Sequence, residues 1–273
     1  MTQTPYRTAL ITGASAGMGA EFARQLAAMG TSLILVARRL DRLTELTREI
    51  QAKHGVKVEV LQADLATSEG VELVERRIED DATFDLLVNN AGFGSGKGSF
   101  HEREAADHLN MIKVHITATV RLTRSALPGM IARGRGAVIN LASIAAFSPV
   151  SGPMYSGTKA FLVMFSENLQ GEMRDKGICV QALCPGMTHT EFHEVADIDK
   201  AIVPKILWMT AEEVVRISLR RLGRGTICIP GWKNKVIAFL MRCPLTAQGM
   251  RALGRSQVVR KRAGRSPQKT NAR

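Results

Sequence analysis

Short apolar runs alternate along the chain with longer stretches in which apolar residues recur at every third or fourth position. The apolar runs occupy residues 8–12, 31–37, 56–63, 85–89, 137–141, 178–184 and 226–230, and their length suits buried strands. The helical spacing occupies the stretch after Gly17 and residues 41–54, 67–80, 101–132 and 153–175. Strands that alternate with helices predict an α/β fold, in which a doubly wound sheet of about seven mostly parallel strands carries helices on both faces.

Glycine and polar residues come directly after the carboxyl ends of the predicted strands. They are the glycine-rich turn at 13–19, Arg38, Asp64, Asn90, Ser143 and the segment 185–188. In open parallel sheets, ligands bind beyond this edge. The sequence therefore predicts one composite site, assembled from loops that lie far apart in the chain.

The first of these loops, Gly13-Ala14-Ser15-Ala16-Gly17-Met18-Gly19, joins a strand directly to a helix. Glycine permits the tight turn and lets backbone N–H groups and the helix N-terminus approach a pyrophosphate. This context is typical of a dinucleotide-binding turn, although a glycine turn between a strand and a helix can also be purely structural. The candidate cofactor-binding residues in this loop are Gly13, Ser15, Gly17, Met18 and Gly19.

Arg38 and Arg39 follow the second strand, where an NAD site carries an acidic residue for the 2′-hydroxyl of the adenosine ribose. Guanidiniums suit a 2′-phosphate instead, which each can bind through two hydrogen bonds. NADP(H) is therefore predicted over NAD(H). The alternatives are that the two arginines form a solvated basic helix cap, and that Asp41 serves NAD; we interpret Asp41 as the N-cap of the next helix.

Tyr155 and Lys159 stand one helical turn apart on the same face of the predicted helix 153–175. A nearby ammonium favours the phenolate and lowers the pKa of a tyrosine. The pair is thus a candidate acid/base device, and Ser143 precedes Tyr155 by twelve positions. Because this spacing also arises by chance in a chain of 273 residues, its meaning depends on the motifs around it.

Five motifs, taken together and in order, closely resemble the short-chain dehydrogenase/reductase family in its NADP-preferring form. They are Thr12-Gly13-x-x-x-Gly17-x-Gly19, Asn89-Asn90-Ala91-Gly92, Ser143, Tyr155-x-x-x-Lys159 and Pro185-Gly186. The resemblance covers residues 6–230 and implies a Rossmann-type sheet. It also implies that Tyr155 is the acid/base residue, that Lys159 holds the nicotinamide ribose hydroxyls, and that Ser143 hydrogen-bonds the substrate oxygen.

The same resemblance assigns cofactor contacts beyond the glycine turn. Asp64 is expected at the adenine, Asn90 beside the cofactor and Thr188 at the nicotinamide carboxamide. The expected cofactor-binding residues after the turn are Arg38, Arg39, Asp64, Leu65, Asn90, Ala91, Gly92, Tyr155, Lys159, Pro185, Gly186 and Thr188.

His115 departs from the family pattern. The family usually has an asparagine at this position, where it helps a water chain to relay protons through the lysine. A neutral imidazole has one donor and one acceptor and can still anchor a water, but it is bulkier and can charge near its ordinary pKa of about 6.5. His115 is therefore a candidate catalytic residue, and the alternative is a helix histidine with no catalytic part.

The net charge of +12 comes from the end of the chain. No Asp or Glu follows Glu213, whereas fifteen Lys and Arg do. Since the whole chain has 37 Lys and Arg and 25 Asp and Glu, the residues up to Glu213 carry 22 basic against 25 acidic side chains. A nucleic-acid-binding protein is not expected, because no aromatic-rich basic surface accompanies this charge.

We divide the chain into a catalytic domain at 1–230, with a substrate lid at 187–209, and a basic helical extension at 231–273. The lid carries many apolar residues, which predict a lipophilic ketone or alcohol as substrate unless these side chains only pack on the sheet. In the extension, an apolar stripe that includes Trp232 and Val236 lies beside lysines; it is expected to rest on an anionic membrane surface, or to dock on the enzyme body or at a subunit interface. Residues 260–273 are expected to lack stable structure.

Four scattered cysteines without metal-type spacing predict reduced thiols, no metal site and a cytoplasmic protein, with peripheral membrane contact through the extension as a further prediction. Neither a secretory signal nor a membrane-spanning segment is expected. The resemblance implies a homodimer or homotetramer built on the helices at 101–130 and 153–175.

The predicted function is NADP(H)-dependent reduction of a ketone or aldehyde, or oxidation of a secondary alcohol, by hydride transfer with Tyr155 as acid/base. The alternative function is a cofactor-binding sensor or scaffold that has weak catalytic activity and associates with a membrane.

Overall fold

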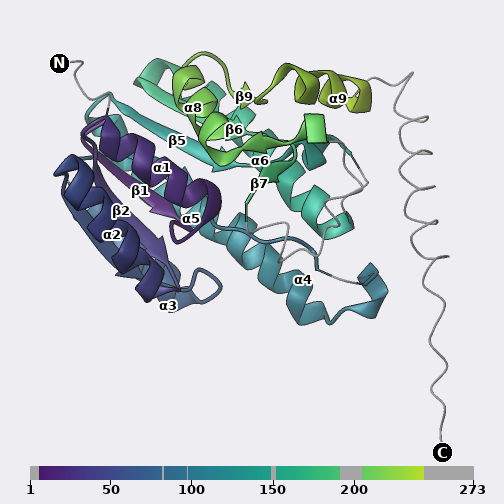
Figure 1. Ribbon diagram of the computed structural model, residues 1–273, viewed down its shortest axis with the longest axis horizontal. Coiled ribbons are helices and arrows are strands. Elements are labelled where there is room, and N and C mark those ends of the chain that lie inside the picture. The colour runs from purple at the N-terminus through teal and green to yellow at the C-terminus, as the bar shows by residue number, and fades with distance from the viewer. Residues whose placement is uncertain (1–5, 82, 97, 149–151, 191–204, 243–273) are drawn as a thin grey trace, which may run out of the picture.

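Seven parallel strands form the main sheet within the described residues, in the order β3-β2-β1-β4-β5-β6-β9 (Figure 1). The structure is a computed structural model that describes residues 6–81, 83–96, 98–148, 152–190 and 205–242. The strands are β1 (Thr8–Thr12), β2 (Ser32–Ala37), β3 (Val58–Gln62), β4 (Phe84–Asn89), β5 (Gly136–Leu141), β6 (Ile178–Leu183) and β9 (Ile227–Cys228). The predicted doubly wound α/β fold is confirmed.

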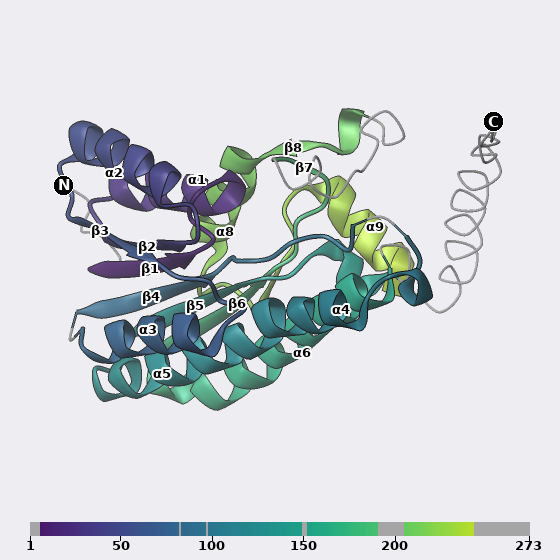
Figure 2. The same ribbon diagram turned by 90° about the horizontal axis from the view of Figure 1, so that it is seen from below.

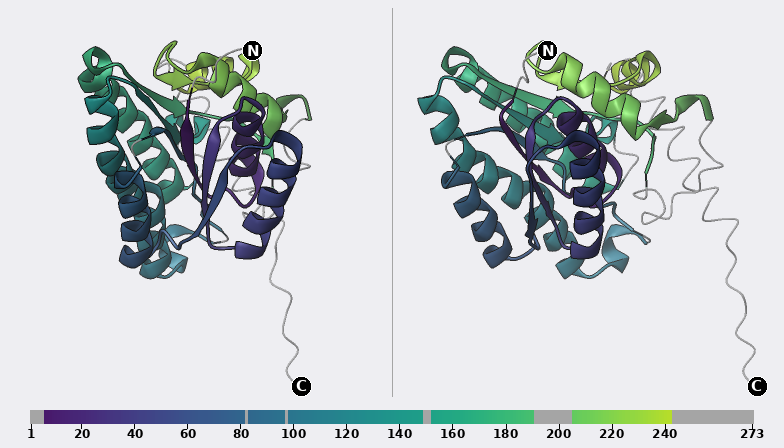
Figure 3. Two further views of the ribbon diagram at one scale, coloured as in Figure 1. Left: turned by 90° about the vertical axis from the view of Figure 1, so that its left-hand side faces the viewer. Right: turned by 60° about the vertical axis from the view of Figure 1, so that its left-hand side comes forward.

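Helices cover both faces of the sheet, as Figure 2 and Figure 3 show. Successive side chains of a strand point to opposite faces, so Ile11 of β1 packs with Phe22 in one core, whereas Leu10 packs with Leu122 in the other. The first face carries α1 (Gly17–Ala28), α2 (Leu40–His54) and α8 (Ala211–Arg221), and the second carries α3 (Ser68–Glu79), α5 (Ala118–Ala132) and α6 (Pro153–Met173).

The helix predicted at 101–132 is interrupted. A 3-10 turn at Phe100–Glu102 precedes α4 (Ala105–Ile112), and a π-helical segment at Lys113–Thr117 then leads into α5. A π-helical segment adds a residue to the turn, and such segments occur frequently at functional sites. The segment contains His115, which is buried.

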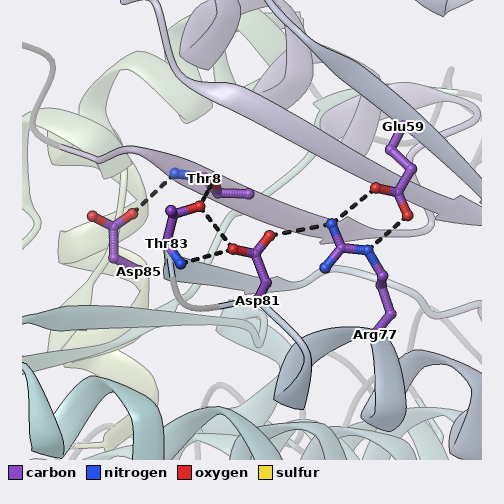
Figure 4. A network of polar contacts seen from close by, with 6 residues as sticks. All are labelled: Thr8, Glu59, Arg77, Asp81, Thr83 and Asp85. Atoms are coloured by element: carbon purple, nitrogen blue, oxygen red, sulfur yellow. Dashed lines mark hydrogen bonds and ion pairs between the residues drawn. The ribbon is translucent and has the colours of Figure 1, made fainter.

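A network of hydrogen bonds and ion pairs links residues at the amino ends of the strands (Figure 4). The Arg77 guanidinium donates to both carboxylate oxygens of Glu59, at 2.7 and 2.9 Å, and to Asp81 at 3.2 Å. Asp81 accepts from the Thr83 hydroxyl at 2.7 Å, and this hydroxyl lies 2.7 Å from that of Thr8. The network ties α3 and the start of β4 to β1 and β3, at the edge opposite to the predicted site.

The predicted lid is described only in part, since residues 191–204 lie outside the described residues. Its described part contains β7 (Thr188–His189) and β8 (Met209–Thr210), which pair in parallel, and a 3-10 turn at Lys205–Leu207. Helix α8, which the sequence did not predict, follows β8 directly.

The described chain ends in α9 (Trp232–Arg242), so the expected lack of structure at 260–273 also falls outside it. No helix within the described ranges is long and apolar enough to cross a lipid bilayer.

Candidate active site

Asn90, directly after β4, holds the turn between β1 and α1. Its side-chain amide donates to the carbonyl oxygens of Thr12 at 2.8 Å and Gly13 at 3.2 Å. The Thr12 hydroxyl in turn accepts from the backbone N–H groups of Asn90 and Ala91, at 3.0 Å each. These bonds fix the two loops at the carboxyl ends of β1 and β4 against each other.

The glycines of the turn allow its tight path between β1 and α1. Gly13 and Gly17 have φ angles of 65° and 55°, in the left-handed region that favours glycine. A Cβ on Gly19 would lie 2.3 Å from the Gly13 carbonyl oxygen and 2.5 Å from the Asn90 side chain. Glycine at position 19 is therefore needed for the turn to pack against α1 and Asn90, and the N-terminus of α1, with the positive end of its dipole, suits a dinucleotide pyrophosphate.

Arg38 and Arg39 lie beyond β2 and beside this turn. The Arg39 guanidinium donates to the Ser15 hydroxyl at 3.1 and 3.3 Å, and Arg38 lies 3.9 Å from Asp64 after β3. Both arginines are exposed, so this ion pair is weak and leaves the guanidiniums accessible to an anionic group. Asp41 is not the N-cap that we predicted: Arg39 holds that position, and Asp41 lies in the first turn of α2, where the helix dipole favours a carboxylate.

Ser143, Tyr155 and Lys159 meet beyond the carboxyl end of β5. The side chains of Ser143 and Tyr155 are hydrogen-bonded to each other. Lys159 is 3% exposed; its Nζ donates to the Leu141 carbonyl oxygen at 2.6 Å and lies 5.6 Å from the centre of the Tyr155 ring. The Pro153 at the first position of α6 starts the helix that carries both Tyr155 and Lys159.

The acid/base properties of this group differ from the sequence-based expectation. Burial raises the pKa of Tyr155 to about 12, and the hydrogen bond with Ser143 offsets only part of this increase. Burial also lowers the pKa of Lys159 to about 8. The predicted lowering of the Tyr155 pKa is wrong for this arrangement, because removal of the phenol from water outweighs the hydrogen bond with Ser143.

His115 has a protein partner on each ring nitrogen. The Phe93 backbone N–H donates to Nε2 at 2.9 Å, so Nε2 carries no proton. Nδ1 lies 3.0 Å from the Thr158 hydroxyl, whose own proton is donated to the Tyr155 carbonyl oxygen at 3.0 Å, so Nδ1 is the donor. The ring is therefore neutral, and burial, followed by the charge of Lys159, holds its pKa well below the ordinary value.

The segment after β6 connects the Ser143 loop to α9. The Pro185 carbonyl oxygen accepts from the Ile144 backbone N–H at 3.0 Å. A Cβ on Gly186 would lie 2.3 Å from the Asn234 side chain, so α9 packs directly on this segment. The buried Thr188 hydroxyl donates to the Gly186 carbonyl oxygen at 3.2 Å.

The predicted site residues thus gather beyond one edge of the sheet. The cofactor candidates follow β1, β2, β3, β4 and β6, whereas Tyr155 and Lys159 reach this edge from α6 and His115 from the π-helical segment. Leu65 differs from the other cofactor candidates, because its side chain is buried in the hydrophobic core of the second face. Thr158 and Asn234 were not predicted from the sequence. A threonine within a helix gives no signal of such a contact. Asn234, in contrast, interrupts an apolar stripe, and a polar residue at such a position indicates a polar contact.

Comparison with known proteins agrees with this arrangement. A model of the short chain dehydrogenase family matches residues 7–200. A very-long-chain 3-oxoacyl-CoA reductase-like protein of Arabidopsis thaliana is 32% identical over 239 residues, which are 85% of this chain and 75% of that protein.

Two solved structures are similar over nearly the whole chain. A short-chain dehydrogenase from Sphingobium yanoikuyae in complex with NADPH has a TM-score of 0.79 and 33% identity, and the match covers 98% of this chain and 99% of that one. The bulky-bulky ketone specific alcohol dehydrogenase from Comamonas testosteroni has a TM-score of 0.75 and 28% identity, with 98% of each chain covered. Because the family model spans well over half of the sequence, this protein belongs to the short-chain dehydrogenase/reductase family.

Proposed function

We propose that this enzyme uses NADPH to reduce a lipophilic ketone, and NADP⁺ to oxidise the matching secondary alcohol. The observation that carries the proposal is the contact between the Ser143 and Tyr155 side chains, with the Lys159 ammonium 5.6 Å from the Tyr155 ring. Two hydroxyl groups that converge beside a buried cation suit a carbonyl oxygen on which negative charge develops.

The residues divide the chemistry as follows. The nicotinamide, when bound, supplies or accepts the hydride. The hydroxyls of Ser143 and Tyr155 donate hydrogen bonds to the carbonyl oxygen, and Tyr155 then gives it a proton. A pKa of about 12 keeps the Tyr155 phenol protonated at neutral pH, and Lys159, with a pKa of about 8, is then an ammonium that favours the phenolate left behind.

The preference for NADP(H) over NAD(H) is also a proposal. Arg38 and Arg39 lie where the adenosine ribose is expected, and Arg39 contacts Ser15 of the glycine turn. The relative from Sphingobium yanoikuyae was solved with NADPH. We infer that the two guanidiniums bind the 2′-phosphate.

The proposed substrate is a ketone with a long or bulky apolar substituent. Phe93 lies edge-to-face with His115, with ring centres 5.3 Å apart, and Phe147 follows Ser143 in the same loop. The names of two relatives, a very-long-chain 3-oxoacyl-CoA reductase-like protein and a bulky-bulky ketone specific alcohol dehydrogenase, support the same class. The apolar lid predicted from sequence is consistent with this class but falls mostly outside the described residues.

A cytoplasmic homodimer or homotetramer completes the proposal. Leu109, Phe161 and Met164 are 56%, 36% and 60% exposed on α4 and α6, the helices expected at a subunit interface. Exposed apolar side chains of this size are typical of interaction sites when they gather on one face. Light scattering of the purified protein tests this part.

The function is tested by incubating the enzyme with NADPH that carries deuterium at the transferable position and with ketones of increasing chain length. The expected result is deuterium on the carbinol carbon of the alcohol product, with rates that increase with apolar chain length. The proposal is wrong if no ketone in the series accelerates NADPH consumption.

A further inference from the structure

Helix α9 is fixed to the enzyme body by one face. Asn234 and Ala238, one turn apart, are 3% and 1% exposed. The Asn234 side chain donates to the Pro230 carbonyl oxygen at 2.9 Å, and the Arg242 guanidinium lies 5.0 Å from the centre of the Phe147 ring. Phe147 belongs to the loop that begins at Ser143, so α9 borders the active site.

The opposite face of α9 is apolar and exposed. Trp232, Val236 and Phe239 are 70%, 47% and 68% exposed, and their spacing of four and three places them on one side of the helix. Ile206, 67% exposed, lies close to this helix, because the Lys233 ammonium donates to its carbonyl oxygen at 3.3 Å. We call Trp232, Val236 and Phe239 the α9 stripe. Large exposed apolar side chains that gather in this way mark an interaction site.

The basic residues around the α9 stripe favour an anionic partner. Lys233, Lys235 and Arg242 are on the same helix, and no acidic residue follows Glu213 anywhere in the chain. Residues 243–273, outside the described part, add eight Lys and Arg and no Asp or Glu. A second copy of this surface would bring like charges together, whereas anionic headgroups above an apolar layer match both the cations and the aromatic side chains.

We propose that the α9 stripe rests on an anionic lipid surface, with Trp232 and Phe239 in the headgroup boundary and the exposed Lys235 at the lipid phosphates. The active site then opens beside the membrane, where lipophilic ketones concentrate. This supply of substrate rests on the proposed function, whereas lipid binding itself does not.

Vesicle co-sedimentation of the full-length protein tests the proposal. We expect binding to vesicles of phosphatidylcholine and phosphatidylserine in equal parts at low salt, much less binding to phosphatidylcholine alone, and release as salt screens the charges. The Trp232→Ser, Phe239→Ser double variant should bind anionic vesicles at least about tenfold more weakly, because two large apolar side chains no longer leave water.

The matched control is the Met29→Ser, Leu73→Ser double variant, in which two side chains that are each 40% exposed, at the C-cap of α1 and on α3, are replaced in the same way. It should sediment like the unchanged protein, and both double variants should keep the rate with a water-soluble ketone. If the unchanged protein does not sediment with anionic vesicles at low salt, the proposal is wrong. It is equally wrong if the α9 double variant sediments like the control, or if its only effect is to dissociate subunits in light scattering. Because sedimentation does not require turnover, loss of binding is distinguished from failure of the proposed activity.

Discussion

The family pattern has an asparagine at the position of His115. The His115→Asn variant tests whether the buried ring is neutral and stabilises the fold by linking two buried polar groups. The ring joins the Phe93 N–H to the Thr158 hydroxyl, on the turn that carries Tyr155. The shorter asparagine cannot reach both partners, so at least one buried polar group loses its hydrogen bond. We expect the His115→Asn variant to be less stable by about 1–3 kcal/mol near neutral pH.

The pH dependence of the unfolding free energy is the more specific test of the neutral His115 ring. The folded pKa of His115 is held below the ordinary value, so in acid the unfolded chain takes up a proton that the folded protein does not. The stability contributed by the neutral ring is present above pH 6.5 and is lost as the pH falls toward the lowered folded pKa. With an unfolded pKa of about 6.5, the unchanged protein loses stability on the order of 1 kcal/mol between about pH 7.5 and about pH 5.5 through this group alone.

Urea unfolding at these two pH values measures the effect. The difference in unfolding free energy between the unchanged protein and His115→Asn should shrink by an amount on the order of 1 kcal/mol in acid, since all other groups titrate in both proteins. His101→Asn is the matched control, because it replaces an exposed histidine in the same way. A difference for His115→Asn that stays constant or widens in acid would refute the assignment of a buried neutral ring.

Three further predictions follow from the same geometry. Gly19→Ala places a methyl group 2.3 Å from the Gly13 carbonyl oxygen, so calorimetry should show weaker NADPH binding and a stability loss of about 1–3 kcal/mol; unchanged binding contradicts the proposed cradle. The Arg38→Ala, Arg39→Ala double variant should weaken NADPH binding about tenfold or more while NADH binding stays within about twofold, as fluorescence titration would show; equal losses for both cofactors exclude a 2′-phosphate site. Because the folded pKa of Lys159 is about 8 and lies below its unfolded value, the unchanged protein should gain roughly 2 kcal/mol relative to Lys159→Met between about pH 7.5 and about pH 9.5, and no gain in denaturant unfolding would contradict a buried ammonium.

The sequence predicted most of the sheet because each strand is a short apolar run and each motif follows its carboxyl end. It did not predict α8, although the capping box of Thr210 and Glu213 at the start of this helix is a signal that the sequence carries. The buried Ser218 hydroxyl and Gln181 side chain, 2.5 Å apart, join α8 to β6. Two polar residues that pair across 37 positions leave no periodic pattern, so this contact is visible only in three dimensions.

The sequence predicted which residues lie together beyond the edge of the sheet, but not the electrostatics that they meet there. Tyr155, Lys159 and Ser143 were identified from spacing, yet the direction of the Tyr155 pKa shift depends on burial, which spacing does not report. His115 was recognised as a departure from the family pattern, but its tautomer depends on the Phe93 N–H and on a π-helical segment that has no recognised sequence signal. Local patterns therefore locate reactive groups, and tertiary contacts set their protonation.

The central claim is that Tyr155 is the acid that completes carbonyl reduction by this short-chain dehydrogenase/reductase. Single-turnover reduction of an accepted ketone by NADPH, compared between the unchanged enzyme and Tyr155→Phe, tests it most directly. We expect a rate at least about a hundredfold lower in Tyr155→Phe, the contribution expected of a general acid, with NADPH affinity unchanged within about twofold. An undiminished single-turnover rate in that variant would contradict the account.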